Sequence, residues 1–336
     1  MAFVEARQIR RAGVSGPQFV APASNTHAAW SVARSGDGSC IFLDRAGGHL
    51  CEIHRAAGAA ALPSACRHFP RKILRDARGT FVSLSHFCPT AALMLLADDP
   101  LVVVEAGPAL RLDEPIEGLD AVHELPPLVR PGLLCDFKGY AAWERGCLQI
   151  LARTDLTYRQ ALHLIAASTE IVREWRPGAV AMVDQVAHAF HQRPVGYAAA
   201  APDAHRRAIE TVVTLSAGRI PGGFMPIDGF DPLWAAHAAA PFERFDQGMK
   251  NYLAARLFGT WMAYQGRGLR STVAWLQTAA ALVRHHFLKR VMAAPAHPGA
   301  DDFIEAVRMT DLLLLHVLDT VAFARHVVPI EGPGSK

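Results

Sequence analysis

Four of the six cysteines in the chain lie in one stretch, between residues 38 and 89. They are Cys40, Cys51, Cys66 and Cys88, and each belongs to a short apolar or turn-forming segment. Four thiolates brought to one point can hold an iron–sulfur cluster or a structural zinc ion. The residue types and their clustering therefore predict that these four cysteines are the ligands of one metal site.

The spacing leaves the kind of site open. Zinc ribbons usually contain two Cys-x-x-Cys pairs, which this chain lacks, whereas single cysteines on separate loops suit an iron–sulfur cluster held by several segments. Zinc can also be held in that way, and reduced thiols that bind no metal are a third interpretation. Cys135 and Cys147 lie outside the stretch, and we expect both to be small buried apolar residues.

The first two cysteines lie in apolar runs separated by Gly47 and Gly48. Paired glycines between such runs indicate a β-hairpin, because glycine supplies the positive φ angles of tight turns. With an even-length loop, Cys40 and Cys51 would be diagonal neighbours on one face, roughly 7–8 Å apart. That separation is too long for an unstrained disulfide but suits two ligands of one metal.

Several segments resemble a known family. The run CxFLD…LCxIH…CRxFPR…SLSxxCP resembles the YkgJ-type cysteine-cluster proteins, and most closely the flagellin lysine-N-methylases. The segment from Lys250 to Phe258 is similar to the helical ENYL element of that group, and the segment from Phe323 to His326 is similar to its C-terminal helix. One motif differs, because residues 22–30 contain no cysteine where the family usually has some.

The resemblance implies a 4Fe-4S cluster, with zinc as the alternative. It also implies transfer of a methyl group from S-adenosylmethionine to a lysine of a protein substrate. Such a reaction needs a neutral amine aimed in line at the methyl group, and the sequence identifies no catalytic base. A non-enzymatic metal-binding protein and an electron-transfer or cluster-carrier protein are the alternative functions.

The resemblance and the position beside the cysteines single out five further residues. Arg67 and Arg71 are candidates for hydrogen bonds to a negatively charged cluster, with surface ion pairing as the alternative. Asn251, Tyr252 and Arg256 are candidates for lining a donor pocket, with hydrogen bonding between helices as the alternative. Three histidines near the cysteines are expected in hydrogen-bonding or surface roles, with metal ligation as the alternative: His54, His68 and His86.

Composition and motifs exclude several classes. The chain has 336 residues, of which 51% are hydrophobic and 19% are charged, as in a compact folded protein. Its formal net charge of +3 is too small to indicate a nucleic-acid partner. We expect a cytoplasmic protein without a membrane partner, and oligomeric state is not indicated. The chain lacks the dinucleotide-binding Gly-x-Gly-x-x-Gly, the P-loop, Gly-x-Ser-x-Gly and His-Glu-x-x-His. A basic cluster is interpreted as a solvated surface, with attraction of an anionic cofactor group or an acidic substrate as the alternative: Arg67, Arg71, Lys72, Arg75 and Arg78.

The periodicity predicts a mainly α fold, in which a small N-terminal cysteine-cluster module with a β-hairpin packs on a C-terminal multi-helix domain. We place the module at 1–97, a connector at 98–132 and the helical domain at 133–330. Thr157 and Gln160 form a capping box that begins a helix. Helices are predicted over 54–62, 91–96, 157–175, 179–192, 202–217, 241–265, 269–292 and 302–328, strands over 80–85 and 101–105, and an irregular link over 220–240.

Overall fold

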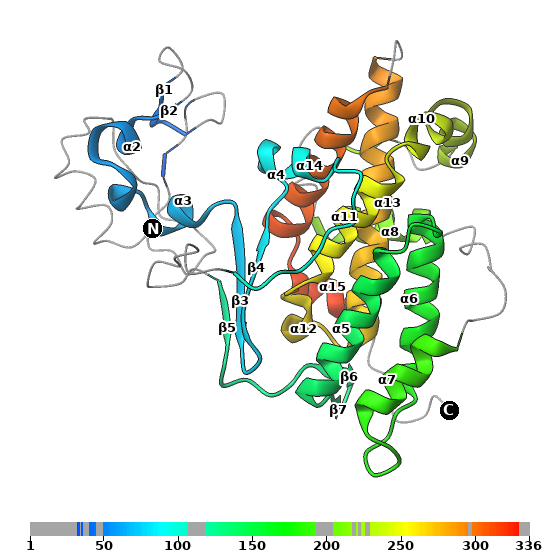
Figure 1. The fold of residues 1–336 in the computed structure, drawn as a ribbon. Helices are drawn as coiled ribbons and strands as arrows, with labels where there is room; N and C mark the ends of the chain where they lie inside the picture. Colours follow the sequence, from blue (N-terminus) through cyan, green and yellow to red (C-terminus); the bar gives the residue numbers. More distant parts are fainter. Residues whose placement is uncertain are drawn as a thin grey trace. The chain divides into compact units, whose positions relative to one another are not determined.

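The computed structural model describes residues 32–33, 35, 40–44, 50–106, 118–192, 204–216, 220, 223–225, 229–294 and 298–328. Within these residues the protein is mostly helical and contains a few small sheets (Figure 1). The chain divides into two compact units, Met1–Phe69 and Pro70–Lys336. The division thus falls before residue 97, the predicted end of the cysteine module.

The first unit contains short elements around a very small described core. Its strands are β1 (Leu43–Asp44) and β2 (Leu50–Cys51), and its helices are α2 (Glu52–Ala57), the 3-10 helix η1 (Ala59–Ala61) and α3 (Ser64–His68). The helix predicted over 54–62 is therefore two helices, separated at Gly58, which has a φ of 76°. In the described part of this unit, the buried apolar cluster consists of Phe42 and Ile53, with half-buried neighbours packed around them.

Strands β1 and β2 pair antiparallel, but in a different register from the predicted one. Leu43 lies opposite Cys51, and Asp44 lies opposite Leu50, so five residues separate the strands. Cys40 precedes Leu43 by three positions and is not a diagonal neighbour of Cys51. The predicted even-length loop is therefore wrong, while Gly47 and Gly48 themselves lie outside the described residues.

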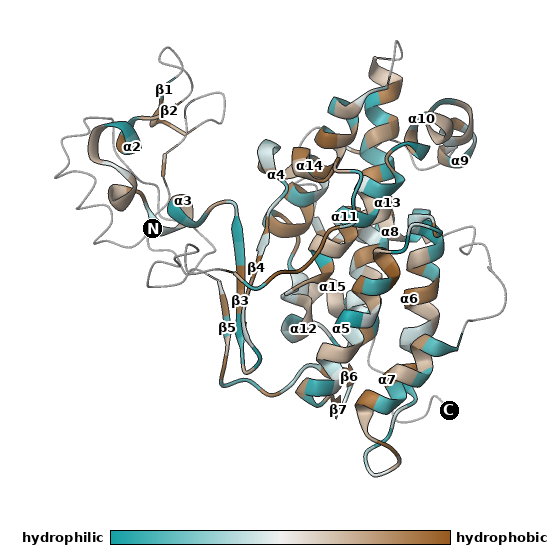
Figure 2. Cartoon of the chain, in the orientation of Figure 1, coloured by the Kyte–Doolittle hydropathy of each residue, from teal (hydrophilic) through white to brown (hydrophobic). Residues whose placement is uncertain are grey.

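The second unit begins with a three-stranded sheet. Strand β3 (Arg71–Asp76) lies between β4 (Gly79–Leu84), which is antiparallel to it, and β5 (Leu119–Ala121), which is parallel to it. Strand β4 matches the strand predicted over 80–85, whereas β3 was not predicted, because its charged residues were interpreted as a solvated surface. Ile73 and Leu74 are the apolar pair of this strand, with charged residues on both sides of them, and Figure 2 shows that much of β3 is hydrophilic.

Because of the strand, the residues of the basic cluster differ in exposure. Successive side chains of a strand point to opposite faces, so charged neighbours meet different surroundings. Arg71 and Arg75 are exposed, whereas Lys72 is half-buried. Arg78, in the turn between β3 and β4, forms ion pairs with Asp76 at 2.8 Å and with Glu144 at 3.1 Å. The interpretation as a solvated surface therefore fails for Lys72 and Arg78.

A helical body makes up the rest of the second unit. Its long helix α13 (Leu269–Ala293) is buried on most sides, as expected for a helix without a wide polar face. Helices α6, α8, α11 and α14 pack against it. The remaining elements are α4 (Pro89–Met94), β6 (Leu128–Arg130), β7 (Leu133–Leu134), α5 (Phe137–Leu151), α6 (Tyr158–Arg173), α7 (Met182–His191), α8 (Ala204–Ser216), α9 (Phe230–Leu233), the π-helix η2 (Trp234–Ala238), α10 (Ala239–Glu243), α11 (Asp246–Leu257), α12 (Met262–Gln265), α14 (Ala300–His316) and α15 (Thr320–Val327).

Most predicted helices of this body are present, and the capping box at Thr157 and Gln160 is confirmed. The observed helices differ from the predicted ones where a predicted helix is interrupted or where a predicted link contains helices. The predicted helix 241–265 is interrupted after Leu257, and the link 220–240 contains α9 and the π-helix. The last predicted helix is also divided, because the carboxylate of Asp319 accepts bonds from two backbone amides and begins α15.

Residues 101–105 were predicted as a strand, but among the described residues they pair with no other strand. No helix in the described ranges is both long and apolar enough to cross a lipid bilayer.

Candidate metal-binding cysteines and their surroundings

The four cysteines of the predicted site differ from the other two in accessibility. None of the six forms a disulfide; Cys40 and Cys66 are exposed, and Cys51 and Cys88 are half-buried. Cys51 immediately precedes α2 and packs against the small core of the first unit. Cys66 lies within α3, and Cys88 precedes Pro89 at the start of α4.

Cys135 and Cys147 belong to the core of the second unit, as predicted. They are 4% and 0% exposed and pack among apolar side chains. Burial raises the pKa of both thiols, because the thiolate form would lose its hydration. These two sulfurs are therefore unsuited to bind a metal or to react with a solute.

The described residues do not by themselves assemble a metal site. Among them, no three histidine, cysteine, aspartate or glutamate side chains are grouped so that they could hold a metal ion. Cys40, Cys51 and Cys66 belong to the first unit and Cys88 to the second. The convergence of the four sulfurs therefore stays a prediction from the sequence.

The loop that carries Cys88 is firmly attached to the helical body of the second unit. The backbone amide of His86 donates a hydrogen bond to the carboxylate of Asp311 in α14. Arg308, also in α14, donates to the carbonyl of Phe87 at 3.1 Å. From α11, Arg256 donates to the carbonyl of Leu84. Two helices thus fix the backbone just before the Cys88 thiol.

Asp311 is the centre of this network. It is fully buried, and it accepts a hydrogen bond of 2.7 Å from the hydroxyl of Tyr252. Its carboxylate lies 3.5 Å from Nη1 of Arg256 and 3.5 Å from Nδ1 of His86. Burial alone would raise the pKa of Asp311, but the guanidinium of Arg256 and the donated hydrogen bonds lower it to about 2. The group is therefore a buried carboxylate anion at neutral pH.

Positive charge surrounds this anion. Burial, with the charge of the nearby Arg256 acting in the same direction and Asp311 acting against them, lowers the pKa of Lys72 to about 7. The Nζ of Lys72 lies 5.2 Å from the ring centre of Trp261. Burial also lowers the pKa of His86, although its hydrogen bond to Asp311 opposes the shift.

The candidate donor-binding residues of α11 have partners inside the protein. Asn251 donates to the carbonyls of Leu95, Ala97 and Asp99 and accepts from the amide of Leu101, so it holds the chain after α4. Tyr252 and Arg256 bind Asp311 and the Cys88 loop, as described above, and the three side chains are at most 4% exposed. Among these bonds, those of Tyr252 and Arg256 to Asp311 join α11 to α14, whereas those of Asn251 go to the segment after α4.

The other residues singled out from the sequence are placed as follows. Arg71 is exposed at the start of β3, and Arg67 is half-buried in α3. Of the three histidines, His54 is exposed, whereas His68 and His86 are buried.

Asp311 was not singled out from the sequence, and Lys72 was expected only as part of a solvated surface. The signal for Asp311 was present, since it is an acidic residue next to the apolar run Leu312–Leu315. A carboxylate within such a run is rarely buried unless it is paired, so it indicates a buried partner. Its partner Arg256 is 55 positions away, and no spacing rule connects the two.

Comparison of the chain with protein-family models, with curated proteins and with solved structures finds no match.

Proposed function

We propose that this protein binds one iron–sulfur cluster, or one zinc ion, through Cys40, Cys51, Cys66 and Cys88. The observation that supports the proposal best is the division of the thiols. The four clustered in the sequence form no disulfide and are exposed or half-buried, and the two outside the cluster are buried in the core. A thiol must be deprotonated and reachable to ligate a metal, so only the first four are suitable donors.

The small described core of the first unit also supports the proposal. Two buried apolar side chains, Phe42 and Ile53, stabilise little structure by themselves. Modules with so little core usually depend on disulfides or metals, and the cysteines here form no disulfide. Metal binding by such a module contributes directly to its folding free energy. The proposed setting is the cytoplasm, where thiols stay reduced.

The network before Cys88 favours an anionic ligand at that position. A metal bound by four thiolates carries net negative charge, so cations near its ligands favour it. Arg256 belongs to the network that holds the Cys88 loop, Lys72 is close enough to Arg256 and Asp311 for their charges to interact, and Asp311 balances one of the two positive charges. The hydrogen bonds that fix the Cys88 loop do not involve a metal. Metal binding therefore requires little loss of backbone entropy at this ligand.

The resemblance to lysine N-methylases supports a second proposal, that the protein transfers a methyl group from S-adenosylmethionine to a lysine of another protein. The residues named for the donor do not fit this role, because Asn251, Tyr252 and Arg256 are buried and bound to partners within the second unit. We therefore assign no residue of this chain to hold the donor. A structural metal site and a cluster for electron transfer remain the alternatives.

Metal analysis of single variants tests the first proposal. The protein is purified without oxygen, and iron, zinc and acid-labile sulfide are measured per chain. Cys→Ser substitution at position 40, 51, 66 or 88 is expected to lower the metal content strongly, because each change removes one of four ligands. The matched controls are Cys135→Ala and Cys147→Ala, which are expected to keep the metal content of the wild type. Equal metal content in all six variants, or none in the wild type, would contradict the proposal.

The same preparation separates the alternative functions. Absorbance near 400 nm together with sulfide indicates an iron–sulfur cluster, and a colourless protein containing zinc indicates a structural site. Transfer of a labelled methyl group to a lysine-bearing partner would support the methylase. A reversible redox couple without such transfer would support electron transfer.

A further inference from the structure

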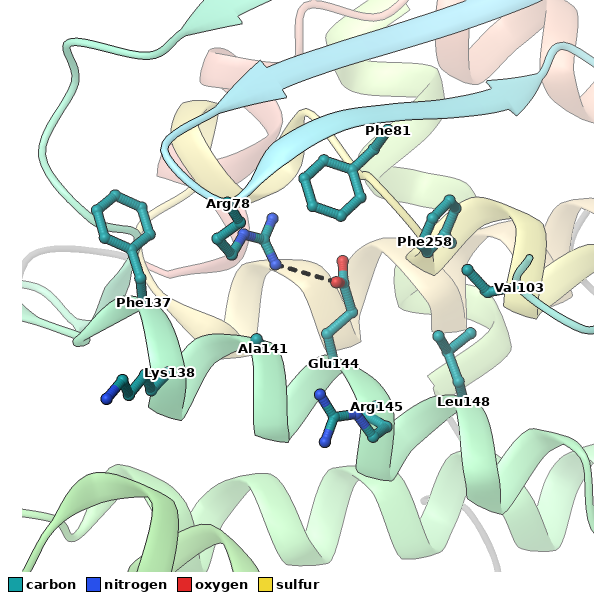
Figure 3. A pocket seen from close by; sticks show the side chains of 10 residues that line it. All are labelled: Arg78, Phe81, Val103, Phe137, Lys138, Ala141, Glu144, Arg145, Leu148 and Phe258. Carbon is teal, nitrogen blue, oxygen red and sulfur yellow. Dashed lines mark hydrogen bonds and ion pairs between the residues drawn. The ribbon is translucent and has the colours of Figure 1, made fainter. Parts of the chain in front are cut away.

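A pocket of about 370 Å³ lies in the second unit, between the β3–β4 hairpin and α5 (Figure 3). None of the six cysteines lines it, and it is separate from the network around Asp311. Its lining residues are Arg78, Phe81, Val103, Phe137, Lys138, Ala141, Glu144, Arg145, Leu148 and Phe258.

The walls of the pocket are largely apolar and aromatic. The rings of Phe81 and Phe258 meet edge to face, with their centres 5.6 Å apart, and form one wall. Phe137, Leu148 and Val103 contribute further apolar surface, and the side chain of Val103 is 47% exposed. Such walls favour a ligand with a flat apolar body, since burying it removes apolar area of both partners from water.

The charged groups at the base of the pocket satisfy one another. The guanidinium of Arg78 lies over the rings of Phe81 and Tyr140, 4.5 and 4.7 Å from their centres. It is paired with Glu144, as Figure 3 shows, and also with Asp76. The second oxygen of Glu144 accepts a hydrogen bond from the amide of Gly259 at 3.2 Å. A ligand therefore gains little from these groups.

Two cations on α5 are not satisfied in this way. Lys138 and Arg145 are exposed, and within the described residues neither forms an ion pair. They are seven positions apart, or about 10 Å along the helix axis. Ala141 lies between them on the same side of the helix and leaves room there because its side chain is a single methyl group.

We propose that this pocket binds an amphipathic organic anion, with its flat apolar body against Phe81 and Phe258 and its carboxylate or sulfonate near Lys138 and Arg145. Charge complementarity selects this class. The acidic side chain in the lining is already paired, so the charges still open to a ligand are positive. The inference goes beyond metal binding and does not depend on it.

A pair of fluorescent probes tests the proposal on the full chain. Anilinonaphthalene sulfonate has a flat apolar body and one negative charge, and phenylnaphthylamine has the same rings without the charge. The anionic probe is expected to bind at one site and more tightly than the neutral probe. Lys138→Gln together with Arg145→Gln should weaken the anionic probe about tenfold, as expected for two exposed charge contacts, and leave the neutral probe unchanged.

Two further variants make the result specific to this pocket. Ala141→Phe fills the space between the cations, so binding of both probes should be lost while circular dichroism stays unchanged. The matched control is Arg207→Gln with Arg325→Gln, which removes two exposed charges outside the pocket and should leave both affinities unchanged.

Three outcomes would overturn the proposal: equal affinity for the two probes, an unchanged anionic affinity in the Lys138/Arg145 variant, or full binding by Ala141→Phe. If Ala141→Phe fails to fold, the comparison of the two double variants still decides, since all four substitutions are at exposed positions.

Discussion

At the scale of single residues, Asp311 has the largest expected effect on stability. Its carboxylate is the buried counter-charge of Arg256 and accepts hydrogen bonds from Tyr252 and from the amide of His86. Asp311→Asn keeps the shape but leaves a buried guanidinium without its anion. We expect the free energy of unfolding at pH 7 to fall by about 3–5 kcal/mol, measured by urea titration. Tyr252→Phe removes one hydrogen bond and should cost about 1 kcal/mol.

The same carboxylate predicts a dependence on pH. Folding lowers the pKa of Asp311 from its ordinary value of 3.8 to about 2. The folded state therefore binds fewer protons than the unfolded state between these values, so the stabilisation is present above about pH 4 and is lost as the pH falls toward 2. Asp311→Asn should lack this part of the stability profile. If Asp311→Asn loses as much free energy of unfolding between pH 4 and pH 2 as the wild type does, the loss is due to other groups.

Lys72 is expected to react as an amine at neutral pH. Burial and the nearby Arg256 lower the pKa of Lys72 from 10.5 to about 7. At pH 7, about half of the protein molecules therefore carry a neutral amine at Lys72. Reductive methylation with formaldehyde and cyanoborohydride, which reduces the imine, is followed by mass spectrometry of the Lys72 peptide and should show a rate that is half-maximal near pH 7. In urea-unfolded protein, the half-maximal rate of the same residue should move toward pH 10. Coincident profiles in the folded and unfolded chains would refute the expectation.

At the scale of elements, the break after α11 depends on a glycine. Gly259 has a φ of 57°, and a Cβ at this position would lie 2.8 Å from Cβ of Phe81 in β4. Gly259→Ala therefore combines backbone strain with a clash against the strand, and we expect a loss of about 2–3 kcal/mol in the free energy of unfolding. Gly178→Ala is the control, since its φ is 84° but nothing lies within 4 Å of the added Cβ; about 1 kcal/mol is expected. Equal losses in the two variants would show that the contact with Phe81 has no cost.

The distance in sequence between an element and its partners explains which elements could be predicted from the sequence. Helix α6 has a local capping box at Thr157 and was found, because its signal lies within four residues. Strand β3 was missed, because its charged residues have distant partners, as Asp76 has in Tyr264, 188 positions later, and such a segment looks like a solvated one. The break at Gly259 depends on contact with Phe81, which is also far away in the sequence.

For the candidate site too, the sequence identified residues but not their long-range contacts. The sequence separated the clustered cysteines from Cys135 and Cys147, and the structure gives the two groups different accessibility. The hydrogen bonds that hold the Cys88 loop were not predictable, since His86 and Asp311 are separated by 225 positions. Composition identifies residue types suited to a chemistry, and long-range packing decides what surrounds them.

At the scale of the whole molecule, the two units differ in what stabilises them. The second unit is built around α13, whose side chains pack among those of several helices, and it needs no ligand to have a core. The described part of the first unit has a core of two residues. If the four cysteines bind a metal, a large part of the stability of the first unit depends on that metal.

Hydrogen exchange measured by mass spectrometry, with metal bound and after chelation, tests this difference. Chelation is expected to increase exchange strongly in residues 50–69, because a unit with a small core opens when its ligand is removed. The peptides of α13 should change little in the same sample, and a variant with serine at all four clustered cysteines should not respond to the chelator. Uniform loss of protection across both units would mean that the metal stabilises the whole chain. Unchanged exchange in residues 50–69 would mean that this unit is stabilised without a metal, by contacts outside its described core.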